Sequence, residues 1–262
     1  MTTGRLLVCV AVLLGVTGAP MAGGIIGNWS GSSRSWNHLS FATIRSLMIS
    51  QGHTVLPDSA ISSGNLAGVS LFVIGEPTTT PGSAELSALQ SWVQAGGVLL
   101  LLSDAPGFDS VAVRLNAIST GLGASLVWSG NASNNTPLAG GVFATTGPPY
   151  NVVGQTLQVS PATAVSGGTA LAGDYLGYQQ IGLGYIFGFG DRSDNNFFNP
   201  STSNVHGQLF LNLAAGAPGP RPPDDGMVIP EPSTFLLLGT GLALVGVWLR
   251  RRRSGSEQEK RA

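Results

Sequence analysis

The stretch VSLFVIGEPTTTPGSAELSALQSWVQAGGVLLLLSD, residues 69–104, decides the fold class. It opens with an apolar run over 69–74 and closes with a second over 98–102, and each is suited to a strand buried on both faces of a sheet. Between them, residues 81–95 carry apolar side chains at helical spacing, with a proline in the first turn and two glycines at the end. Strand, helix and strand in this order predict a parallel sheet covered by helices.

The flanking sequence extends the pattern on both sides. Upstream, it predicts strands over 25–27 and 54–56 and a helix over 35–50. Downstream, a helix over 109–119 is followed by clusters of glycine, threonine and asparagine that separate shorter strands, over 126–128, 156–159 and 181–189, before a last helix over 205–213. The expected fold is one α/β domain over 25–215, a parallel sheet with helices on both faces and a second half richer in strands. A secreted β-sandwich is the alternative.

Composition excludes several classes of function. Only 10% of the residues are charged, and between residues 23 and 220 four arginines face eight acidic residues with no lysine, so a nucleic-acid partner is excluded. The single cysteine, Cys9, lies in an apolar run near the start, so a mature product without that run has no thiol for a disulfide, a zinc site or nucleophilic attack. We expect no cofactor and no metal.

The first 24 residues read as a signal peptide. Arg5 precedes an apolar run over 6–18, which is the charge order that secretory signals have. Small residues at 16–18 and 22–24 offer two cleavage points and leave that choice open. The general secretion machinery and signal peptidase are therefore expected partners.

The C-terminal 47 residues predict a second targeting segment. A linker over 216–227 is rich in proline and glycine, and it leads to Pro230-Glu231-Pro232. The 18 uncharged residues from Pro232 to Leu249 would reach about 27 Å as a helix, close to the thickness of a bilayer core. We expect a transmembrane helix over 233–249, stopped by the basic cluster Arg250, Arg251, Arg252 and Arg253, with a cytoplasmic tail over 254–262.

Residues 228–253 resemble the PEP-CTERM sorting signal, because Pro-Glu-Pro, an apolar helix and an arginine cluster follow one another in that order. The resemblance implies a Gram-negative bacterium that makes extracellular polysaccharide, transient residence in the inner membrane, processing by an exosortase, and a mature protein at the cell surface or in the biofilm matrix. A permanent membrane anchor is the alternative interpretation of the same segment.

The central domain resembles flavodoxin-like, class I glutamine amidotransferase-like domains. The residues that carry the resemblance are Gln51 to Val55, Leu89 to Leu102, Gly188 to Asp191, and Asn212-Leu213. In those enzymes the nucleophilic cysteine occupies a sharp turn after a buried strand, and the resemblance places that turn at Ser103 to Gly107. Since no cysteine is present there, glutaminase chemistry is not expected. Ser103 also lacks the neighbouring glycines that a serine nucleophile needs to turn tightly.

The predicted ligand site is the rim formed by Glu76, Ser103, Asp104 and Asp191, because ligands bind at the carboxyl ends of parallel strands. Asp191 to Asn196 groups oxygen ligands but lacks the glycine and distal glutamate of an EF-hand, so calcium binding is left open. The histidines, at positions 38, 53 and 206, are expected at helix ends or on the surface. The expected function is a non-enzymatic interaction or structural domain with exopolysaccharide as its partner. A secreted hydrolase of glycans or esters is the alternative.

Overall fold

The structure is a computed structural model that describes residues 23–132, 136–140, 142, 150–159, 161–191 and 200–216. The chain divides into two units at Arg221 and Pro222, and every described residue belongs to the first. The predicted signal peptide to residue 22, the transmembrane helix over 233–249 and the tail lie outside the described residues. Within the described ranges, no helix has the length and apolar character needed to cross a bilayer.

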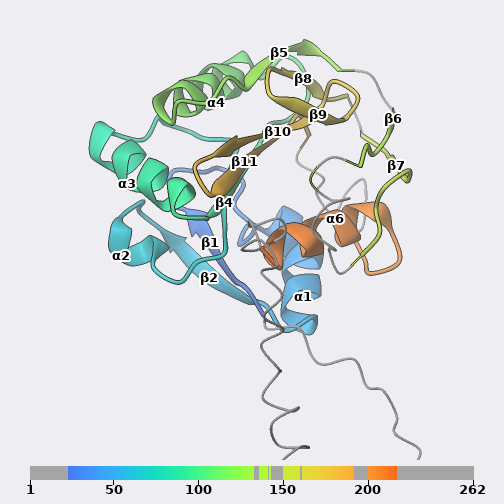
Figure 1. Ribbon diagram of the computed structural model, residues 1–262, viewed down its shortest axis with the longest axis horizontal. Coiled ribbons are helices and arrows are strands. Elements are labelled where there is room, and N and C mark those ends of the chain that lie inside the picture. Colours follow the sequence, from blue (N-terminus) through green and yellow to red (C-terminus); the bar gives the residue numbers. More distant parts are fainter. Residues whose placement is uncertain are drawn as a thin grey trace, which may run out of the picture. The chain divides into compact units, whose positions relative to one another are not determined.

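A seven-stranded sheet forms the centre of the domain, with the order β2-β1-β3-β4-β11-β10-β9 (Figure 1). The first five strands in this order are mutually parallel: β2 (Thr54–Ser59), β1 (Ile25–Trp29), β3 (Leu71–Gly75), β4 (Val98–Leu102) and β11 (Gly184–Phe189). Two antiparallel pairings then add β10 (Leu176–Ile181) and β9 (Thr169–Ala172) at one edge. The predicted mixed α/β fold with a large, mostly parallel sheet is confirmed, and a β-sandwich is excluded.

Helices cover both faces of this sheet (Figure 1). On one face lie α1 (Ala42–Ser50), which follows the short 3-10 helix η1 (Leu39–Phe41), and α6 (Val205–Ala214). On the other lie α2 (Ser63–Leu66), α3 (Ser83–Gln94) and α4 (Asp109–Gly121). Successive residues of β3 alternate between two apolar cores, with Leu71 and Val73 in the first and Phe72 and Ile74 in the second. This alternation explains why the strand is apolar throughout.

Two small antiparallel pairs complete the second half. β5 (Val127–Asn131) pairs with β8 (Thr163–Ser166), and β6 (Thr136–Pro137) pairs with β7 (Thr156–Leu157). The fully buried Trp128 of β5 packs over Gly188 of the main sheet. A Cβ atom on Gly188 would lie only 2.8 Å from Cζ2 of Trp128. The glycine is therefore required so that β5 can approach the sheet.

Two predicted elements differ from the structure. The helix expected over 35–50 begins only at Leu39, because Asn28 Oδ1 accepts the Trp36 N–H at 3.1 Å and the Ser35 hydroxyl donates to Asp58 at 2.8 Å. These bonds hold the preceding residues in turns. The strand expected over 181–189 is one arm of a hairpin that turns at Gly182, whose φ is 63°. Its other arm, β10, escaped prediction because its glycine and glutamines weaken the apolar signal.

Candidate functional site

The predicted rim residues follow three neighbouring strands. Glu76 comes directly after β3, Ser103 and Asp104 come after β4, and Asp191 comes two residues after β11. Because these strands are adjacent and parallel, their carboxyl ends share one edge of the sheet. All four residues are buried, with relative exposures of 7% for Glu76, 1% for Ser103, 7% for Asp104 and 3% for Asp191. That this edge binds a ligand remains a prediction.

Glu76 has a strained backbone. Its φ is 45°, and among the described residues it alone combines a positive φ with a side chain beyond glycine. Backbone hydrogen bonds hold it there: its N–H donates to Leu102 O at 3.0 Å, and its carbonyl accepts from Ser33 N at 3.1 Å and Ser33 Oγ at 3.0 Å. Such a conformation costs free energy and persists only where neighbouring groups impose it, often at functional sites.

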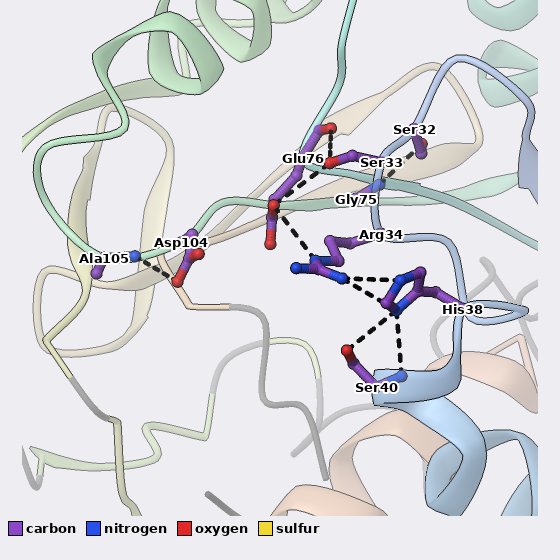
Figure 2. A network of polar contacts seen from close by, with 9 residues as sticks. All are labelled: Ser32, Ser33, Arg34, His38, Ser40, Gly75, Glu76, Asp104 and Ala105. Atoms are coloured by element: carbon purple, nitrogen blue, oxygen red, sulfur yellow. Dashed lines mark hydrogen bonds and ion pairs between the residues drawn. The ribbon is translucent and has the colours of Figure 1, made fainter. Parts of the chain in front are cut away.

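Arg34, which the sequence reasoning did not single out, contacts the Glu76 side chain (Figure 2). Its Nε lies 3.8 Å from Glu76 Oε2, and its Nη1 lies 2.8 Å from Nε2 and 3.2 Å from Nδ1 of His38. His38 Nδ1 also accepts the Ser40 N–H at 3.1 Å, which caps η1. The signal that could have found Arg34 is its place in a polar loop directly after β1, the strand next to β3.

Ser103 lacks the partners of a serine nucleophile. Its Oγ is buried and makes no hydrogen bond within the part of the chain that the structure describes. The strained turn lies at Glu76, one strand away, and the sharp turn near Ser103 falls instead at Gly107, with φ 101°. An activated serine needs a base within hydrogen-bond reach, and no described residue supplies one to Ser103.

The other two histidines, His53 and His206, form hydrogen bonds away from the rim. His53 accepts the Gly24 N–H at 3.0 Å near the amino end of β1, and burial lowers its pKa below 6.5. His206 Nε2 donates to Gln158 O at 2.6 Å, and burial lowers its pKa to about 4, against the opposing effect of that hydrogen bond. Both rings are therefore neutral near pH 7 and serve to join segments of the fold.

Asp104 shapes a turn with its side chain. Its Oδ1 accepts the Ala105 N–H at 2.7 Å (Figure 2). Its backbone carbonyl accepts the buried Thr163 hydroxyl at 2.7 Å. Residues 192–199 are outside the described ranges, so the predicted calcium loop after Asp191 is untested. Across the ranges that are described, no group of three or more His, Cys, Asp or Glu side chains is placed to hold a metal ion.

Comparison with protein families matches residues 228–253 to the PEP-CTERM protein-sorting motif. These are the bounds predicted from Pro230-Glu231-Pro232, the apolar segment and the arginine cluster. The motif defines an exported protein that passes through a membrane-associated sorting step and has an exosortase as its processing partner. Comparison with the curated proteins found no match.

Among solved structures, the chain is similar to one described as mmIFT52 N-terminal domain, with 14% identity, a TM-score of 0.55, and coverage of 72% of this chain and 97% of the other. It also matches two cytoplasmic proteins from Salmonella typhimurium. These are STM1381, from strain LT2, with 14% identity, TM-score 0.47 and coverage of 73% and 98%, and STM3548, with 11% identity, TM-score 0.46 and coverage of 74% and 98%. At these identities the first likeness shows the fold alone.

Proposed function

We propose that the mature protein is a non-catalytic binding module at the cell surface or in the extracellular matrix, with exopolysaccharide as its partner. The proposal that the module is non-catalytic rests on the surroundings of Glu76. The strained turn after β3 carries a buried carboxylate that pairs with Arg34 and bonds to Ser33. The Glu76 carboxylate therefore links the loop after β3 to the loop after β1. The turn after β4, where the resemblance places a nucleophile, carries Ser103, whose hydroxyl has no hydrogen-bond partner among the described residues.

The positions where the chain enters and leaves the domain support display of the rim. Ser70 Oγ lies 3.0 Å from Ile25 O at the start of β1 and 3.3 Å from Ala214 O at the end of α6. Both ends of the described domain therefore meet at the amino ends of the parallel strands. The rim lies at the carboxyl ends of the same strands, so both ends of the described domain lie opposite the rim.

The sorting half of the proposal is tested in the native host. We expect the wild-type strain to yield a product that ends near Pro230 to Pro232 and is recovered outside the inner membrane. A strain without the exosortase should retain the full-length protein in the membrane. Mass spectrometry of the purified protein measures both. An intact C-terminus in both strains would show a permanent membrane anchor with a periplasmic domain.

The molecular role is tested on the full chain purified in detergent. We expect it to co-sediment with matrix polysaccharide from its host and to release no sugar or acid from glycan or ester substrates. Turnover that is abolished by Asp104→Asn or Asp191→Asn would replace this proposal with a secreted hydrolase that uses the rim carboxylates.

A further inference from the structure

A cavity of about 340 Å³ opens beside the rim, between the start of α4 and the strands β5 and β8. These elements lie side by side at one end of the domain in Figure 1, and α4 packs on β5. Thr163 lines the cavity and donates its hydroxyl to the Asp104 carbonyl, so the cavity adjoins the rim without including its four predicted residues. Its volume is at the lower end of the range for small-ligand sites, roughly 300 to 1,000 Å³.

One wall of the cavity is fixed by a pair of hydrogen bonds. Asn116 of α4 accepts the Trp128 N–H at 2.7 Å and donates its amide to the Trp128 carbonyl at 3.0 Å. The Trp128 ring is itself buried, with 1% exposure. The helix and the strand are therefore held together whether or not the cavity is filled, and a ligand would meet a preformed wall.

An exposed aromatic residue, Phe108, lines the cavity and is not part of the hydrophobic core. Phe108 is 50% exposed, and it caps α4 only through its backbone carbonyl, which accepts the Val111 N–H at 2.8 Å. Gly107 and Gly130 border the opening with φ of 101° and 64°, and no atom lies within 4 Å of where their Cβ atoms would be. About half of the Phe108 surface is thus open to a ligand.

Besides Asn116 and Thr163, three polar residues line the cavity: Asp109, Ser129 and Asn131. All three residues are exposed, and no side-chain hydrogen bond joins them to any other part of the described chain. Together they offer a carboxylate, a hydroxyl and an amide beside the ring of Phe108. Among the described residues that line the cavity, Asp109 is the one charged residue, and none is a cation.

We propose that this cavity binds a neutral sugar ring of a polysaccharide. A sugar ring presents C–H groups that pack on an aromatic face and hydroxyls that bond with carboxylate, hydroxyl and amide groups. An apolar ligand would leave those polar groups unpaired, and an anionic ligand such as a phosphate or a uronate would meet a carboxylate with no cation to offset it. The inference rests on the proposed function, because it names the site and ligand class for the same partner.

The experiment titrates the full chain with oligosaccharides by calorimetry, in a detergent without a sugar headgroup. The probes are neutral oligomers of glucose, mannose and N-acetylglucosamine, with oligogalacturonate as the anionic counterpart. Phe108→Ala removes the ring, and Leu183→Ala, at a residue 55% exposed on the β10–β11 hairpin, is its matched control. Ser129→Trp fills the opening, and Val127→Trp is its control because Val127 lies on the same strand outside the cavity lining.

We expect at least one neutral oligomer to bind, and Phe108→Ala to weaken that binding roughly tenfold while Leu183→Ala leaves it unchanged. Ser129→Trp should abolish binding, and Val127→Trp should not. Asp109→Asn should raise the affinity for oligogalacturonate relative to the neutral oligomer, an effect that a purely structural role would not produce.

Two outcomes separate this inference from the proposed function. If the wild type binds matrix polysaccharide and both cavity variants bind it equally well, the cavity is not the site, although the partner is right. If a neutral oligomer binds in the cavity but matrix polysaccharide does not bind, the cavity inference stands and the proposed partner is wrong. Absence of binding to every neutral oligomer overturns the cavity inference.

Discussion

The guanidinium of Arg34 lies 3.8 Å from the carboxylate of Glu76, and this ion pair joins the loop after β1 to the loop after β3. The pair sits where the sheet order reverses, since β1 lies between β2 and β3. In open α/β sheets, ligands usually bind in the crevice that forms at such a reversal, beyond the carboxyl ends of the strands. Here the Arg34 side chain is 32% exposed and that of Glu76 is 8% exposed, so Arg34 is the partner that solvent reaches more easily.

The strain at Glu76 can be isolated with two substitutions. Glu76→Ala and Glu76→Gly both remove the carboxylate, but only glycine adopts a φ of 45° without steric cost. We expect both variants to be less stable than wild type, and Glu76→Gly to be more stable than Glu76→Ala by about 1 kcal/mol. Urea unfolding followed by circular dichroism measures the difference. Equal stabilities would show that the backbone at this position is not strained.

The pKa of His206 predicts a loss of stability in acid. Its folded pKa is about 4 while its ordinary value is 6.5, so between these values the unfolded chain binds a proton that the folded domain does not. The stabilisation is complete above pH 6.5 and should decline as the pH falls toward 4, by on the order of 3 kcal/mol in total.

His206→Gln tests this prediction, because glutamine can still donate to Gln158 O but does not titrate. The free energy of unfolding, measured from pH 8 to pH 4, should fall less steeply in the variant than in the wild type. Parallel curves for the two proteins would show that another group causes the acid sensitivity.

The contact between Gly188 and Trp128 predicts a non-additive pair of substitutions. Gly188→Ala would place a methyl group 2.8 Å from Trp128 Cζ2 in a packed core and should cost roughly 2 kcal/mol. Trp128→Phe removes the ring atoms that the methyl group would meet.

We therefore expect the double variant to be at least about 1 kcal/mol more stable than the sum of the single effects implies. Thermal unfolding of the four proteins completes the cycle. Additive effects would mean that the core yields elsewhere to the new methyl group.

We expect a substitution in the sorting motif to prevent processing while leaving the described domain folded. Glu231→Ala changes the motif matched over 228–253, and the described domain ends at Gly216. In the native host we expect the unprocessed chain to accumulate in the membrane fraction, with unchanged export across the inner membrane. Glu257→Ala, in the predicted cytoplasmic tail, is the control and should be processed normally. Normal processing of the Glu231 variant would show that this residue is not required.

The sequence by itself determined the elements whose signals are local. The apolar runs of β3 and β4 and the helical spacing of α3, α4 and α6 lie within short windows, so the α/β class could be predicted from them. The sorting segment was equally readable, because its proline motif, apolar stretch and arginine cluster follow one another in the chain. A strand that is buried on both faces is apolar throughout, so its own sequence indicates the burial.

Only the tertiary structure decided which distant residues meet. Arg34 reaches Glu76 because β1 and β3 are neighbours, and no local pattern in either loop specifies that pairing. The positive φ of Glu76 is imposed by bonds from Leu102 and Ser33, since glutamate itself disfavours that conformation. The cavity beside Phe108 likewise exists because β5 and β8, which residues 132–162 separate in the chain, pair with each other beside α4. Such contacts depend on how the elements assemble, and periodicity along the chain does not encode them.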